Sequence, residues 1–96
     1  MSYLSQIQST LKKMKPELTA KYSVNSIGLF GSVVRNDFNE NSDIDVIVDF
    51  SKPIGIEFID LANYLEKVFK RKIDLVSKKG IKERYFREIE GEIIYV

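Results

Sequence analysis

Residues 43–50, Asp-Ile-Asp-Val-Ile-Val-Asp-Phe, are the most regularly patterned stretch of this 96-residue chain. Apolar side chains occupy every second position, at Ile44, Val46, Val48 and Phe50. Three of the four positions between them are aspartates. A period of two is typical of a β-strand, because successive side chains point to opposite faces of a sheet. The stretch therefore predicts a strand with one apolar face and one face that carries carboxylates.

Further elements are expected on both sides of this strand. Before it, an apolar stripe predicts a helix over residues 2–21, which Pro16 should kink or restart, and residues 24–30 predict a short buried strand. After it, the sequence predicts, in order, a helix over 55–70, a strand over 72–76, a short helix over 81–89 and a final strand over 92–96. A helical turn at 33–35 and a polar loop over 36–42 complete the chain. The expected fold class is α/β (α+β), with a mixed sheet of three to four strands flanked by helices.

The composition excludes several kinds of chemistry. The chain has no cysteine and no histidine, so thiolate nucleophiles, histidine triads and the usual zinc sites are ruled out. Its 15 basic and 14 acidic residues give a net charge of +1, which is not the footprint of a generic DNA-binding protein. No apolar run is long enough for a membrane span, and the first residues lack a secretory signal pattern, so a cytoplasmic protein is expected.

Strand geometry brings the carboxylates together. Asp43 and Asp45 are two residues apart, so they share one face of the strand. The helix over 55–70 favours a right-handed parallel crossover to the strand over 72–76, which would place Asp74 beside them. Carboxylates gathered in this way repel one another unless a divalent cation lies among them. The sequence therefore predicts a metal site formed by three aspartates at one sheet end.

An anion site is expected next to these carboxylates. Only ten residues separate Gly31-Ser32 from Asp43, and so short a return favours an antiparallel neighbour. Gly31 allows close approach of the backbone, and Ser32 at a helix start offers a hydroxyl beside unpaired N–H groups. Arg35 lies one turn further and can offer its planar guanidinium to the same anion. An anion site beside a cation site is what a metal-bound nucleoside triphosphate requires.

Taken together, these residues resemble a known family. Gly31-Ser32, the ten-residue interval, the Asp43-Ile44-Asp45 motif and the later Asp74 are similar to the minimal nucleotidyltransferases of the DNA polymerase beta superfamily, of the MntA-like antitoxin type. The resemblance covers residues 27–96 and implies a single nucleotidyltransferase domain over 1–96, with an N-terminal helix at 2–21 and a catalytic core at 24–96.

The resemblance also implies roles for the site residues. Asp43 and Asp45 would hold magnesium, and Asp74 would be the general base or a ligand of a second magnesium ion. Gly31, Ser32 and Arg35 would bind the triphosphate of the substrate, ATP, whose α-phosphorus is attacked by a hydroxyl while pyrophosphate leaves. The family often has glycine where this chain has Asn36, and asparagine tolerates left-handed backbone well, so we expect this loop to keep its form.

The acceptor of the nucleotide is not given by any motif and stays open between a protein hydroxyl, an RNA end and a small alcohol. The family is commonly paired with a helical HEPN-type protein in a toxin-antitoxin unit, so that protein is the expected partner and acceptor. A second copy of the chain is another partner that the terminal strand could pair with.

Three other functions compete with this interpretation. An aspartyl phosphatase would need threonine shortly after the second aspartate, where Val46-Ile47 stand, and a glycosyltransferase with an Asp-x-Asp motif would need a far longer chain. The remaining alternative is an inactive nucleotide-binding module that neutralises a toxin by complex formation alone. Such a degenerate protein should have lost a carboxylate, and this chain retains Asp43, Asp45 and Asp74.

Overall fold

The computed structural model describes residues 2–35 and 37–96 and shows helices packed on a small sheet. Its regular elements are α1 (Tyr3–Tyr22), β1 (Val24–Phe30), β2 (Ile44–Phe50), α2 (Glu57–Phe69), β3 (Ile73–Ser77), α3 (Glu83–Ile89) and β4 (Ile94–Tyr95). Two short 3-10 helices, η1 (Gly31–Val33) and η2 (Glu90–Glu92), follow β1 and α3 respectively. Asn36, and with it the expectation about its backbone, lies outside the described residues.

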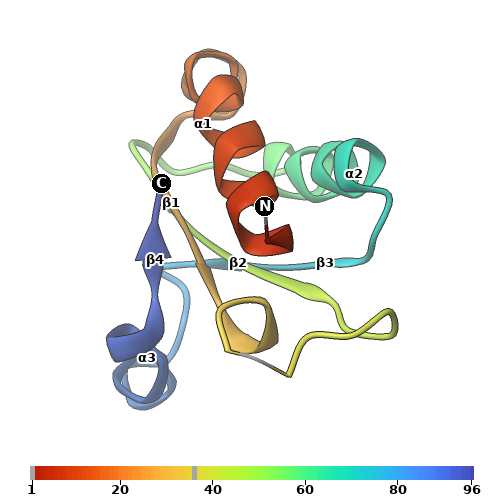
Figure 1. The fold of residues 1–96 in the computed structure, drawn as a ribbon. Coiled ribbons are helices and arrows are strands. Elements are labelled where there is room, and N and C mark those ends of the chain that lie inside the picture. Colours follow the sequence, from red (N-terminus) through yellow and green to blue (C-terminus); the bar gives the residue numbers. More distant parts are fainter. Residues whose placement is uncertain (1, 36) are drawn as a thin grey trace.

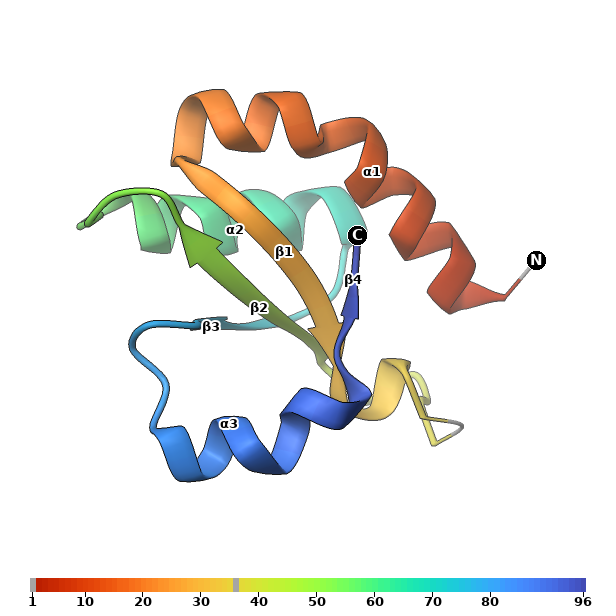
Figure 2. The ribbon, with the colours of Figure 1, turned by 90° about the vertical axis from the view of Figure 1, so that its left-hand side faces the viewer.

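The sheet has the strand order β3-β2-β1-β4 (Figure 1). β1 runs antiparallel to both β2 and β4, whereas β2 and β3 are parallel, as the crossover through α2 predicts. α1 and α2 cover one face of the sheet, and α3 lies on the other side (Figure 2). The expected mixed sheet flanked by helices is confirmed.

The alternation in β2 separates two apolar clusters. Ile44, Val46 and Val48 are buried in the larger cluster, together with residues of α1 and α2. Ile47 points the other way, into a small cluster with Ile89 of α3. Asp45, two residues before Ile47, therefore projects from the α3 side of the sheet, which is the less covered face.

Pro16 does not restart the first helix as a separate element. It lies inside α1, which runs without interruption from Tyr3 to Tyr22. Leu11 and Leu18, on either side of Pro16, are fully buried, and this packing on the sheet holds both halves of the helix in register. The expected restart was therefore wrong, because burial outweighs the single backbone hydrogen bond that proline removes.

Two further boundaries differ from the sequence expectation. The predicted helical turn at 33–35 is instead η1, because the carbonyl of Gly31 accepts hydrogen bonds from the N–H groups of Val34 and Arg35, at 3.0 and 3.1 Å. The final strand is restricted to Ile94–Tyr95, because η2 occupies the residues up to Glu92. In the described residues, no helix is long and apolar enough to cross a membrane.

Candidate active site

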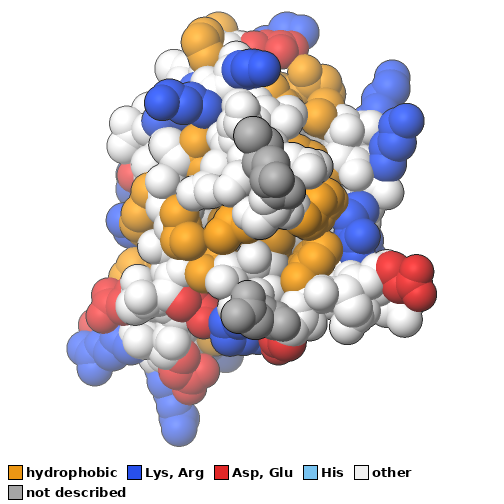
Figure 3. Space-filling model, viewed as in Figure 1, with side chains coloured by type: hydrophobic (Ala, Val, Ile, Leu, Met, Phe, Trp, Pro, Cys, Tyr) orange, Lys and Arg blue, Asp and Glu red, His pale blue; other side chains and the backbone are white. Residues whose placement is uncertain are grey.

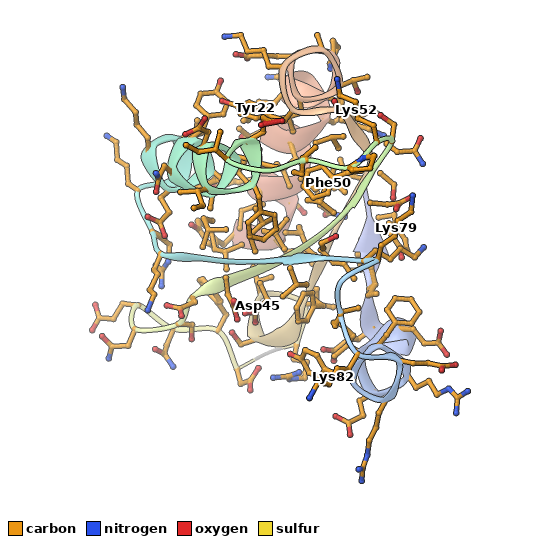
Figure 4. All side chains as sticks on the ribbon, turned by 180° about the vertical axis from the view of Figure 1, so that it is seen from behind. Tyr22, Asp45, Phe50, Lys52, Lys79 and Lys82 are labelled. Carbon is orange, nitrogen blue, oxygen red and sulfur yellow. The ribbon has the colours of Figure 1, made fainter. Side chains whose placement is uncertain are left out.

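Two aspartates face each other across the parallel strands. Asp45 of β2 and Asp74 of β3 are register partners, so their side chains project from the same face of the sheet. Figure 4 shows Asp45 on the opposite side of the sheet from Phe50 and Tyr22. Asp74 lies on an edge strand and is exposed, whereas Asp45 is half-buried. The convergence of these two carboxylates, expected from the crossover, is present in the structure.

The surroundings of Asp45 raise the pKa of its carboxyl group. Burial, followed by the charge of Asp74 and a hydrogen bond with it, raises the pKa of Asp45 from 3.8 to about 6. Asp43 adds a smaller effect in the same direction, and Arg35 opposes it. A carboxylate whose pKa is raised by other carboxylates lies where a cation would be bound favourably.

The residues present fit a hard cation only in part. In the described part of the chain, no group of three or more acidic side chains is gathered closely enough to hold a metal ion. Asp43 precedes β2 and affects Asp45 through its charge, and Asp45 and Asp74 supply the paired oxygens. Mg²⁺ is commonly bound by one or two carboxylates, with substrate phosphates and water as its other ligands. The donor set therefore fits a magnesium ion that arrives with a nucleotide.

Gly31 joins the anion side of the site to the carboxylates. It follows Phe30, the register partner of Asp45, and its φ of +74° lies in the left-handed region that favours glycine. A Cβ at this position would collide with the carboxylate of Asp45. The absence of a side chain at Gly31 thus lets the turn lie directly against the Asp45 carboxylate. Ser32, the second residue of η1, is half-buried beside this turn.

Arg35 is held at the site by Glu92, a residue that the sequence did not point to. The Arg35 Nη1 donates to Oε2 and Oε1 of Glu92, at 3.1 and 3.3 Å, and the Gly31 N–H donates to Oε1 at 2.9 Å. The hydrogen bond with Glu92, followed by the charge of Asp37, raises the pKa of Arg35. Two of the three residues predicted to bind an anion therefore already share one carboxylate.

Tyr85 of α3 is a second residue near the aspartates. Burial and then the charges of Asp45 and Asp74 raise the pKa of its hydroxyl, and its side chain is still 43% exposed. The sequence offered no signal for this placement, because the approach of α3 to β2 and β3 is a long-range contact.

Arg71 holds the loop that leads to Asp43. Its guanidinium lies over the rings of Tyr3 and Phe38, at 5.7 and 4.6 Å from their centroids. Its Nη2 donates to the carbonyls of Asn39 and Ser42, at 2.7 and 2.9 Å. Arg71 thereby fixes the chain on the approach to Asp43.

One cavity lies away from the carboxylates. It has a volume of about 450 Å³ and is lined mainly by apolar residues at the other end of β2, including Phe50, Ile54 and Phe58. None of the described residues that line it is acidic, so the chemistry is expected at the open carboxylate face instead. On the face shown in Figure 3, acidic and basic side chains are interspersed, in keeping with the near-neutral net charge.

The sequence matches a known domain family. The nucleotidyltransferase domain family matches residues 11–96. Protein adenylyltransferase MntA of Thermococcus cleftensis is 39% identical over 97 residues, which cover 100% of this chain and 98% of the relative. An inferred protein adenylyltransferase of Methanocaldococcus jannaschii is 43% identical over 98 residues, and the match covers 100% of both chains.

Solved structures show the same fold. An inferred minimal nucleotidyltransferase superimposes with a TM-score of 0.80 and 26% identity, covering 98% of this chain and 95% of the other. A complex described as the tri-AMPylated Shewanella oneidensis HEPN toxin with its MNT antitoxin matches with a TM-score of 0.71 and 19% identity, covering 96% of this chain and 70% of that chain.

Proposed function

The chain belongs to the nucleotidyltransferase domain family, and on that premise we propose that it is a magnesium-dependent protein adenylyltransferase that transfers AMP from ATP to a hydroxyl of a HEPN-type partner. The observation that carries the proposal is the Asp45–Asp74 pair, which lies on one sheet face with the Gly31 turn against Asp45. This arrangement sets oxygen ligands for a cation beside backbone donors for phosphate.

Each site residue has a role in this reaction. Gly31, Ser32 and Arg35 would bind the triphosphate, and Asp45 and Asp74 would hold the magnesium that accompanies it, with Asp43 adding its charge beside them. When bound, magnesium neutralises charge on the phosphates and favours ionisation of the attacking hydroxyl. No histidine is needed for this chemistry, in keeping with a chain that has none.

The transfer itself is a displacement at phosphorus. The acceptor oxygen forms a bond to the α-phosphorus of ATP, and the bond from that phosphorus to the oxygen bridging to the β-phosphorus breaks. Pyrophosphate leaves with the electron pair, and the hydroxyl proton passes to Asp74. Asp74 suits this role because it is exposed on an edge strand, where a side chain of another protein can reach it.

A protein acceptor is supported by the openness of the site and by the relatives. Asp74 and Tyr85 are both accessible from outside, so a bulky acceptor meets no enclosing wall of described residues around them. MntA of T. cleftensis is named a protein adenylyltransferase, and the HEPN toxin in the S. oneidensis complex is AMPylated. A cytoplasmic location accords with this partnership.

The proposal is tested with ATP labelled on either the α- or the γ-phosphate, added with magnesium to the chain and a lysate of its source cell. Label on a HEPN-type protein from the α position alone is the expected result, since AMP keeps only that phosphate. Label from the γ position would indicate phosphoryl transfer and overturn the proposal. Binding of ATP and of the partner without any transfer would instead support the inactive binding module.

A further inference from the structure

Glu92 is held opposite the glycine turn by the register of the sheet. β4 pairs with β1 through Gly28↔Tyr95 and Leu29↔Ile94. Continuing this antiparallel register by two residues places Glu92 opposite Gly31. The hydrogen bond from the Gly31 N–H to Glu92 Oε1, at 2.9 Å, spans that position. The location of the Glu92 backbone is therefore fixed by the strand that follows it.

Glu92 is also the more buried of the two acidic neighbours of Arg35. Its side chain is 26% exposed, whereas that of Arg35 is 52% exposed. The other acidic neighbour of Arg35, Asp37, is 63% exposed and lies 3.5 Å from Nε. A long arginine side chain loses much rotamer freedom when it is held, so the better-anchored carboxylate determines where the guanidinium lies.

The same carboxylate links Arg35 to the metal side of the site. The Gly31 N–H donates to the Glu92 carboxylate, and the Asp45 carboxylate lies against the α-carbon of Gly31. Arg35 lies close enough to Asp45 to lower its pKa against the other influences. One side chain thus fixes the turn and the guanidinium relative to each other and to Asp45.

We propose that Glu92 is a positioning residue, which holds the Gly31 turn and Arg35 in the arrangement that receives the triphosphate. This inference rests on the proposed function for the identity of the ligand. It makes a prediction opposite to that of the alternative, in which Glu92 is a competing anion that ATP must displace. Removal of a positioning residue weakens ATP binding, whereas removal of a competitor strengthens it.

The test compares Glu92→Ala, Glu92→Gln and the control Glu90→Ala, a neighbouring exposed glutamate in η2. We expect Glu92→Ala to raise the Kd for ATP in the presence of magnesium, and the KM for ATP, about tenfold, with a smaller change in kcat. Glu92→Gln should recover part of the loss, because its amide oxygen still accepts the Gly31 N–H. Glu90→Ala should bind ATP like the unmodified chain.

A double variant shows whether Glu92 acts through Arg35. If it does, Glu92→Ala should weaken ATP binding less in the Arg35→Ala background than in the unmodified chain. Full additivity of the two losses, or unchanged or tighter ATP binding by Glu92→Ala, would overturn the inference. Thermal unfolding checks that each variant folds. If Glu92→Ala does not fold, the ATP affinity of folded Glu92→Gln is measured instead, and an affinity equal to that of the unmodified chain would overturn the inference.

Calorimetric ATP binding separates this inference from the proposed function. If the unmodified chain binds ATP but labels no protein, the proposed transfer fails, whereas weakened binding by Glu92→Ala still supports the positioning role. If transfer is observed and Glu92→Ala binds ATP normally, the proposed function stands and the positioning role fails.

Discussion

Asp45 and Asp74 are register partners on two parallel strands, and the charge of Asp74 contributes to raising the pKa of Asp45 to about 6. The pair forms because the α2 crossover returns the chain in the same direction on the neighbouring strand. Two carboxylates so placed cost stability in the absence of a cation and favour its binding. This relationship makes the site sensitive to both pH and magnesium.

The stability of the chain should fall as pH rises through the titration of Asp45. The pKa of this carboxylate is raised from 3.8 to about 6 in the folded chain, so the folded state binds its proton more tightly than the unfolded state. Its stabilising contribution is therefore fully present below pH 3.8 and is lost as pH rises towards about 6. We expect added magnesium to raise the midpoint of thermal unfolding at pH 8 but not at pH 5.

The matched control for this prediction is Asp45→Asn, which keeps the side-chain size and removes the titrating group. Its unfolding midpoint should depend less on pH between 5 and 8 and should respond less to magnesium. Equal stabilisation of the unmodified chain by magnesium at both pH values would contradict the assignment of Asp45 as a metal ligand.

Gly31→Ala should damage both the fold and the site. The new Cβ would collide with the Asp45 carboxylate and would be held at a φ of +74°. We expect the free energy of unfolding in urea to fall by about 1–3 kcal/mol. Gly55→Ala is the control, because no atom of the described residues lies within 4 Å of its added Cβ, and it should change stability by less than about 0.5 kcal/mol. Equal effects of the two substitutions would show that the Gly31 turn is not closely packed against Asp45.

Arg71→Ala should loosen the approach to Asp43. The substitution removes the contacts with Tyr3 and Phe38 and the hydrogen bonds to the carbonyls of Asn39 and Ser42. We expect a loss of about 1–2 kcal/mol in the free energy of unfolding, measured in urea, and faster amide hydrogen exchange at residues 37–42. Lys72→Ala, which alters an exposed neighbour, should leave both measurements unchanged. Exchange that stays unchanged in Arg71→Ala would contradict this role.

Local patterns were sufficient to predict much of the fold and part of the site. The strict alternation in residues 43–50 gave the bounds of β2 to within one residue and identified the face that carries Asp45. The parallel crossover and the short return after Ser32 follow from general rules of chain connection. From these rules the sequence predicted that Asp74 and Gly31 lie at the same end of the sheet as Asp45, as the strand register shows.

What the sequence did not predict depends on contacts between distant residues. Glu92 reaches Gly31 across 61 positions, through the register of a two-residue strand that has no pattern of its own. The continuity of α1 through Pro16 likewise depends on packing of Leu11 and Leu18 against the sheet, whereas the local rule for proline favours a break.

Pro16→Ala tests this account of α1. Alanine restores a backbone N–H inside the helix and removes the clash of the proline ring, while it makes the unfolded chain more flexible. We expect a net gain of about 1–2 kcal/mol in the free energy of unfolding, measured in urea. The control is Thr19→Ala, at an exposed position, which should change stability only slightly. Glu17→Ala would be unsuitable, because Glu17 accepts a hydrogen bond from the Tyr64 hydroxyl. A loss of stability in Pro16→Ala would show that proline fixes a bend that the packing requires.

The most direct test of the central claim is transfer of label from α-labelled ATP to the HEPN-type partner by the unmodified chain and by Asp45→Asn. The substitution removes a charged oxygen ligand but preserves the shape of the side chain, and thermal unfolding confirms that the variant is folded. We predict that the rate of labelling by Asp45→Asn falls at least about a hundredfold. Labelling by the folded variant at the rate of the unmodified chain would contradict the claim that the carboxylate face is the active site.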